Sequence, residues 1–239
     1  MKRAIHHLFQ YNYFGRRVQI TALSLSLVFA FTSCIDEELN IDPNRPSAVQ
    51  TPSLIVTAEK HLLDNIRSES ASLRSSGLFI QQLSQVTYTS QSRYDIPFSY
   101  SDNVWNGLYE VANNLQEIIT LNSNPATKDL VTASGAGLNA TQIAISRVLK
   151  SVAFSALTDI FGDVPYHSHG SNDADFQALQ QNPDNITPKY APQAKIYADI
   201  LNELKQAGDT LLRYSSENTF GSSDIIYGGS NLKWAKFAN

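Results

Sequence analysis

The sequence is dominated by apolar residues that recur at the spacing of an α-helix. This 3.6-residue periodicity predicts helices with one buried face, within residues 54–66, 78–86, 104–119, 141–160 and 196–211. A further helix begins near Asn231. Helices joined by short loops pack as antiparallel pairs, so we expect a mainly α-helical array with long ordered loops.

Helix boundaries are marked by polar and cyclic residues. Thr51 is suited to cap the first helix and Pro52 to occupy its first helical position, while Asp102 can cap the third helix. Residues 122–137 contain Pro and Gly breakers and are predicted to be a loop, as are residues 167–190.

The fourth helix runs into the segment LTDIFGDVPY, Leu157–Tyr166. Gly162 permits a backbone conformation that other residues resist, and Asp163 can hydrogen-bond within its own turn. Pro165 biases the residue before it toward extended geometry. We therefore expect the helix to stop near Phe161, at an aromatic turn.

The stretch 87–101 has no helical period and is rich in aromatic side chains. Either its rings pack onto the helices, which we favour for most of them, or some stand out as a binding platform. The candidate ligand contacts in this stretch are the aromatic residues Tyr88, Tyr94, Phe98 and Tyr100, together with Arg93.

The N-terminus has the pattern of a secretion signal. Four basic residues precede residue 18, and residues 18–31 form a mostly apolar run, too short to span a bilayer. Residues 1–33 are therefore predicted to be a signal peptide. Cys34 is the only cysteine, so no intramolecular disulfide can form.

The residues around Cys34 resemble a lipobox, which implies lipidation of this cysteine after cleavage. The acidic residues 36–38 resemble the surface-export signal of some bacterial lipoproteins, although an ordinary solvated tether would also be acidic. We expect residues 34–50 to form a tether, and an acyl anchor without a membrane-spanning helix.

Net charge excludes one class of partner. Of the 18 basic residues, four precede Cys34, which leaves 14 against 22 acidic residues and a net charge of −8. So acidic a chain has little to offer a phosphate backbone, and we expect no nucleic-acid partner.

Three sets of residues are candidates for a catalytic or metal site. Asp159 and Asp163 could form a glycosidase pair, but each suits a helix end or turn. A site formed by His167 and His169 would lack further metal ligands. Asp173 and Asp175 lack the spacing of a calcium loop. With no phosphate loop or nucleophile elbow in the sequence, we expect no catalysis, cofactor or metal.

The linear order of several segments resembles the SusD/RagB family of nutrient-binding lipoproteins. These segments are FGDVPY at residues 161–166, PKY at 188–190, an amphipathic helix, DIIYGG at 224–229 and KWAKFAN at 233–239. The positions that carry the motifs are Gly162, Asp163, Pro165, Tyr166 and Trp234.

The resemblance implies a tetratricopeptide-like helical domain over residues 51–239. Family members continue past this point, so we expect the domain to be truncated at its C-terminus, as a fragment or a shortened gene. Apolar faces such as those of Trp234 and Phe237 would then be uncovered.

The family further implies a non-enzymatic protein on the cell surface at the outer membrane. It would bind a nutrient, an oligosaccharide in most members, and deliver it to a SusC-type TonB-dependent transporter. Sugar sites in the family use loops in this part of the fold, so the aromatic stretch 87–101 becomes the expected ligand site. The alternative is a helical-repeat scaffold that binds a peptide or protein.

Overall fold

The computed structural model describes residues 50–68, 71, 76–180 and 183–239. The predicted signal peptide, Cys34 and nearly all of the tether lie outside the described residues. Within them, no helix is long and apolar enough to cross a membrane.

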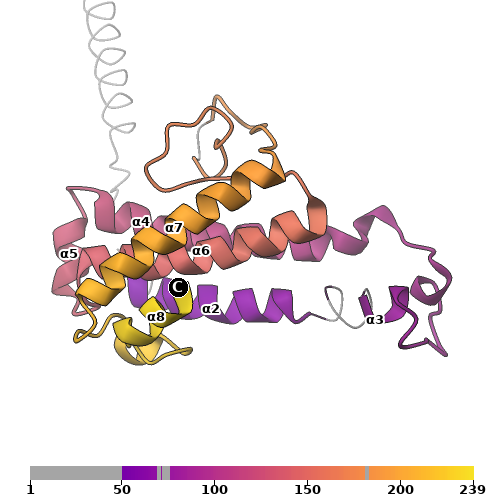
Figure 1. Cartoon of the computed structure of the whole chain (residues 1–239), viewed down its shortest axis with the longest axis horizontal. Coiled ribbons are helices and arrows are strands. Elements are labelled where there is room, and N and C mark those ends of the chain that lie inside the picture. Colours follow the sequence, from indigo (N-terminus) through magenta and orange to yellow (C-terminus); the bar gives the residue numbers. More distant parts are fainter. Residues whose placement is uncertain (1–49, 69–70, 72–75, 181–182) are drawn as a thin grey trace, which may run out of the picture. The chain divides into compact units, whose positions relative to one another are not determined.

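The described residues form an antiparallel array of helices (Figure 1). Its long members are α2 (Thr51–Ile66), α4 (Asp102–Ser123), α6 (Asn139–Phe161) and α7 (Gln193–Arg213), followed by α8 (Asn231–Ala238). Among these residues, β pairing is confined to two isolated bridges, Val164 with Ala191 and Asn218 with Ser230. The predicted mainly α-helical, tetratricopeptide-like array is therefore confirmed.

Helix α6 lies at the centre of this array. It packs between α4 and α7, while α2 covers α4 and α8 covers α7. Apolar side chains such as Ile145, Phe154 and Leu157 are fully buried on it, and so are polar ones such as Gln142 and Ser146. Because α6 is buried around most of its circumference, its polar side chains need partners on neighbouring elements.

The predicted caps of two helices are wrong by one residue. Gln50 and Ser101 occupy the N-cap positions of α2 and α4, so Thr51 and Asp102 are the first residues of their helices. The Thr51 hydroxyl instead donates a 2.7 Å hydrogen bond to Oε1 of Gln142 on α6. A tertiary partner has replaced the local cap.

Two predicted elements differ more. The second helix is α3, which spans only Ser76–Phe79, and the predicted loop 122–137 contains the helix α5 (Lys128–Ala133). The stretch 87–101 has no α-helix, as predicted, but forms the 3₁₀ turns η2 (Gln91–Arg93) and η3 (Phe98–Ser101).

The turn after α6 begins where predicted and connects three helices. Gly162 has φ 76°, which favours glycine, and α6 ends at Phe161. Oδ1 of Asp163 accepts a hydrogen bond from the backbone N–H of Gln193 in the first turn of α7. This carboxylate therefore caps a helix 30 residues away. The predicted hydrogen bond within its own turn is wrong.

The next two residues of this turn fix it against α4 and α7. The Pro165 carbonyl accepts a 2.7 Å hydrogen bond from the Tyr109 hydroxyl of α4. Tyr166 is buried, and its hydroxyl donates to Asp199 of α7. The motif residues are thus structural.

The segment Asp224–Gly229 forms a turn that is closed around the carboxylate of Asp224. Its Oδ1 accepts from the backbone N–H groups of Ile226 and Tyr227, and its Oδ2 accepts from Gly229 N and Trp234 Nε1. Trp234 is fully buried, so the expectation that it would be uncovered is wrong, whereas Phe237 is half exposed.

Glu59 of α2 lies buried against this turn. Its Oε2 accepts a 2.7 Å hydrogen bond from Ile225 N. Burial, and secondarily the charge of Asp224, raise the pKa of Glu59 from 4.5 to about 8. The carboxyl group is therefore protonated at neutral pH.

Stability should fall between pH 5 and pH 8 because of Glu59. The unfolded state ionises this group near pH 4.5 and the folded state only near pH 8, so raising the pH favours unfolding. Each pH unit in this window costs up to about 1.4 kcal/mol. Urea unfolding of Glu59→Gln, which keeps a neutral hydrogen-bonding group, should show a much flatter pH dependence.

The exposed Glu217→Gln variant is the matched control and should keep the wild-type pH dependence. Equal pH slopes for the wild type and Glu59→Gln would contradict a protonated Glu59.

Candidate functional site

The predicted ligand-binding loop places two of its rings in solvent. Tyr88 is 82% exposed and Tyr94 is 53% exposed, so the expectation that most of these rings pack down is wrong for both. Arg93 is also exposed, whereas Tyr100 is half-buried in η3. The side chain of Phe98 lies outside what the structure describes.

Tyr94 is held in place by the chain around α3. Its hydroxyl donates a 2.8 Å hydrogen bond to the Phe79 carbonyl and accepts one from Nε2 of Gln81. Its ring stacks on that of Phe79, with centroids 6.0 Å apart and planes 24° apart. Because these three contacts fix the ring before a ligand binds, binding costs less side-chain conformational entropy.

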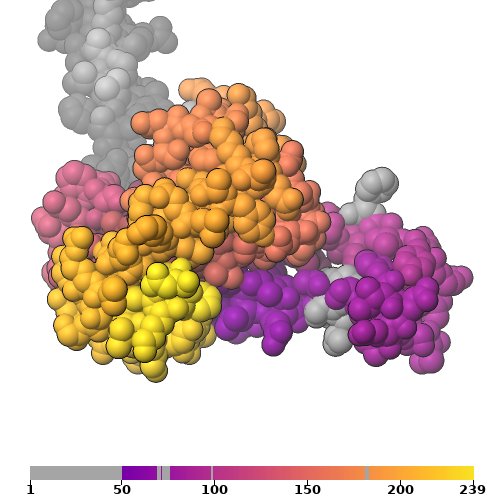
Figure 2. All heavy atoms as spheres, viewed as in Figure 1, coloured from indigo at the N-terminus to yellow at the C-terminus, as the bar shows by residue number. Residues whose placement is uncertain are grey.

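A second pair of bonds ties the two halves of this loop together. The backbone N–H of Gln85 donates to Oγ of Ser92, and the backbone N–H of Ser92 donates to Oε1 of Gln85. We call residues 79–94 the aromatic lobe, and Figure 2 shows it at one end of the helical body. Its exposed side chains include the rings of Tyr88 and Tyr94 and the aliphatic side chains of Ile80, Leu83 and Val86.

An aromatic cluster near the start of α4 was missed from the sequence. Trp105 meets Phe161 edge-on at 5.0 Å and stacks on Tyr190 at 6.2 Å. Tyr190 is 61% exposed. A hollow of roughly 260 Å³ beside the cluster is lined by Trp105, Tyr109, Pro165, Ala178, Leu179 and Pro188. Helical periodicity assigned Trp105 to the core, and nothing in the sequence marked Tyr190 as its partner.

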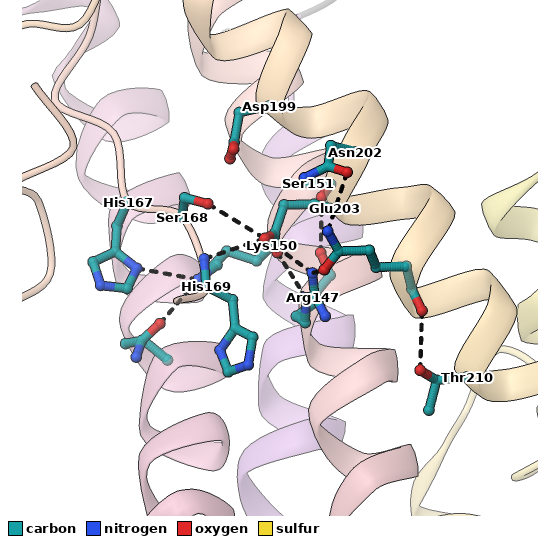
Figure 3. Close-up of polar contacts among 12 residues, drawn as sticks. Arg147, Lys150, Ser151, His167, Ser168, His169, Asp199, Asn202, Glu203 and Thr210 are labelled. Atoms are coloured by element: carbon teal, nitrogen blue, oxygen red, sulfur yellow. Dashed lines mark hydrogen bonds and ion pairs between the residues drawn. The ribbon is translucent and has the colours of Figure 1, made fainter. Parts of the chain in front are cut away.

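A buried polar network connects α6, α7 and the chain after the aromatic turn (Figure 3). Arg147 of α6 donates from Nε and Nη2 to the two carboxylate oxygens of Glu203 on α7, at 2.8 and 3.0 Å. The same carboxylate accepts from the Ser168 hydroxyl and the His169 backbone N–H. Because every oxygen of Glu203 is paired, its charge is neutralised within the protein.

Lys150 lies one turn further along α6 and is also buried. Its ammonium group donates to Oε1 of Gln116 on α4 at 2.9 Å and lies 3.3 Å from Nδ1 of His167. Burial lowers the pKa of Lys150 to about 8, so the side chain is still mostly charged at pH 7. Burial, with Lys150 nearby, lowers the pKa of His167 to about 4.

Above this network lies an open cavity of roughly 390 Å³. Its walls come from the second half of α4 and from the segment that follows the aromatic turn. The lining residues are Gln116, Ile119, Thr120, Ser123, Asn124, His167, Ser168, His169, Gly170 and Ser171. We call this the polar cavity.

The histidines weighed as metal ligands lie in this lining, but His167 is hydrogen-bonded to a lysine. Among the residues that the structure describes, no group of three His, Cys, Asp or Glu side chains could hold a metal ion.

The paired aspartates have structural partners. Asp173 and Asp175 both accept from Lys195 Nζ at 2.7 Å, in the place that a calcium ion would need. Asp159 accepts from the Tyr197 hydroxyl, and Asp163 caps α7 as described above.

Similar folds occur in three solved structures. A SusD/RagB family protein from Bacteroides thetaiotaomicron is 22% identical, with a TM-score of 0.57 over 80% of this chain. A SusD homolog from Bacteroides uniformis is 21% identical, with a TM-score of 0.53 over 77%. A chitin-binding SusD homolog from Flavobacterium johnsoniae is 22% identical, with a TM-score of 0.49 over 77%.

The chain covers 36% of the length of each of these structures. No curated protein matches it. A family model described as "Starch-binding associating with outer membrane" matches residues 43–239, which is most of the chain. The order of motifs from the aromatic turn to Trp234, the helical array and this match agree, and the chain belongs to the SusD-like family.

Proposed function

We propose that this chain is a non-enzymatic, cell-surface lipoprotein that binds an oligosaccharide and delivers it to a SusC-type TonB-dependent transporter. The observation that carries the proposal is the family match over residues 43–239, whose description is starch binding at the outer membrane. The chain covers 36% of the length of the first of these structural relatives, so the activity of the whole protein is part of the proposal.

The aromatic lobe is the proposed sugar-contacting surface. A sugar ring has an apolar face and an edge of hydroxyl groups, so its site needs flat rings with hydrogen-bonding side chains around them. Tyr88 and Tyr94 offer the rings, and Gln81 and Arg93 offer the polar groups beside them. The fixed position of Tyr94 favours it as the main stacking residue.

The same lobe also supports contact with a protein. Ile80, Leu83 and Val86 are 62%, 50% and 96% exposed, and branched aliphatic side chains fit protein surfaces better than sugar rings. The proposed transporter would cover these side chains. This observation also favours the second candidate, a scaffold that binds a peptide or protein and no sugar.

The proposed organisation follows from the N-terminal pattern. Residues 1–33 would be removed as a signal peptide, Cys34 would carry the acyl chains, and residues 34–50 would tether the helical domain, residues 51–239, to the outer membrane. Two or more acyl chains make such an attachment stable.

Removal of the Tyr94 ring should weaken glycan binding. Aromatic stacking on a flat ligand is worth about 1 to 3 kcal/mol per ring, so Tyr94→Ala should lower affinity roughly tenfold to a hundredfold. The measurement is calorimetric titration of the full chain with a panel of oligosaccharides.

Two variants serve as controls for that titration. Tyr94→Phe keeps the ring and should retain most of the affinity, and Tyr214→Ala removes a tyrosine far along the sequence and should change nothing. Equal affinity of Tyr94→Ala and the wild type would refute the stacking site, and a chain that binds no glycan would favour the scaffold.

Lipidation is tested separately. The Cys34→Ala variant should incorporate no labelled fatty acid and should leave the membrane fraction, because the only cysteine is gone. Labelled fatty acid in the variant would overturn the anchor.

A further inference from the structure

Two amide side chains in the lining of the polar cavity use their oxygen atoms within the protein. Oε1 of Gln116 accepts from Lys150, and Oδ1 of Asn124 accepts from Ala126 N at 2.9 Å. The NH₂ group of each amide is the hydrogen-bond donor that it can offer to a ligand.

His167 also offers a hydrogen-bond donor. Its neutral ring must accept at Nδ1, because the ammonium group of Lys150 can only donate. The ring proton then lies on Nε2. Three side chains from two separate segments thus present N–H donors, and no carboxylate is among the lining residues.

The ammonium group of Lys150 places a positive charge beneath the cavity. Arg147 is paired with Glu203, whereas the described residues place no carboxylate within 4.0 Å of Lys150 Nζ. Its two partners, Gln116 and His167, are neutral. Glu203 and Asp199 act on Lys150 without a direct ion pair. Burial of its charge is costly, and a bound anion above it would offset part of that cost.

We propose that the polar cavity binds the carboxylate of an acidic sugar, such as a uronic acid residue of the glycan. The inference rests on the proposed function for the sugar, and on the donor-lined cavity for the carboxylate. The carboxylate would accept from the amides of Gln116 and Asn124 and from Nε2 of His167. A neutral sugar would gain the hydrogen bonds but not the interaction with Lys150.

The test is a titration of the full chain with three probes. These are a galacturonic acid trisaccharide, the neutral galactose trisaccharide and acetate. The acidic trisaccharide should bind at least tenfold more tightly than either of the others, a difference of about 1.4 kcal/mol.

Two variants change the cavity in opposite ways. Asn124→Asp keeps the oxygen that accepts from Ala126 but replaces the NH₂ donors with a negatively charged oxygen, and it lies on the surface, so the fold should persist. It should lose at least tenfold in affinity for the acidic probe and little for the neutral one. Lys150→Met removes the buried charge at similar volume and should abolish the acidic preference.

The pH profile gives an independent readout. Above pH 8 Lys150 loses its proton, so the acidic preference should decline there. The ionisable groups around it are Arg147 on α6, Asp199 and Glu203 on α7, and His167 and His169 on the adjoining segment. In Lys150→Met this decline should disappear. The exposed Lys205→Met variant on α7 is the control and should behave as the wild type.

Each result decides the proposal. It is overturned if the neutral trisaccharide binds as tightly as the acidic one, if acetate matches the acidic trisaccharide, or if Asn124→Asp leaves the acidic preference intact. Binding of neutral glycans alone, with sensitivity to Tyr94→Ala, would refute this subsite and leave the proposed function standing. Binding of no glycan at all would refute both.

Discussion

The fold depends on a central helix that is buried although it carries many polar side chains. Every buried donor or acceptor on α6 that lacks a partner would lower the stability of the fold by about 1 to 3 kcal/mol. The surrounding elements must therefore place a partner opposite each of these groups along the helix. Gln142 meets Thr51 of α2, Arg147 meets Glu203 of α7, and Lys150 meets Gln116 of α4. These pairings restrict the relative positions of the helices more than apolar packing alone would.

The same constraint shapes the surface above α6. Lys150 donates to Oε1 of Gln116 and Nδ1 of His167, and both side chains line the polar cavity, where their N–H groups are the donors that they can offer to a ligand. The chemistry of that cavity is thus a consequence of what α6 buries. The aromatic lobe differs, because its rings are fixed by bonds within residues 79–94 and several of its apolar side chains face solvent. The polar cavity thus depends on contacts in the core, whereas the aromatic lobe depends on contacts among neighbouring residues in the sequence.

Sequence periodicity predicted the long helices because each buries an apolar stripe on the array. Periodicity predicted the second helix, residues 78–86, too long because the apolar side chains in its second half are not buried. Leu83 and Val86 continue a helical pattern, but they are exposed, and a short helix without packing is unstable in water. Helix α5 was missed for a different reason, because its six residues are too few to show a period.

The site was predictable only in part. The sequence identified Tyr88 and Tyr94 as candidate ligand contacts, but exposure depends on the packing of α3 and could not be derived from residue types. The polar cavity had no linear signature, since Gln116, Lys150 and His167 come from three segments. The family motif around Gly162 located the turn that positions His167, without revealing the lysine beneath it.

The most direct test of the account is a crystal structure of the chain with a bound galacturonic acid oligosaccharide. The account predicts a sugar carboxylate within hydrogen-bond distance of the Asn124 amide nitrogen and Nε2 of His167, above Lys150. An oligosaccharide bound elsewhere, with its carboxylates in solvent and the polar cavity filled only by water, would contradict it.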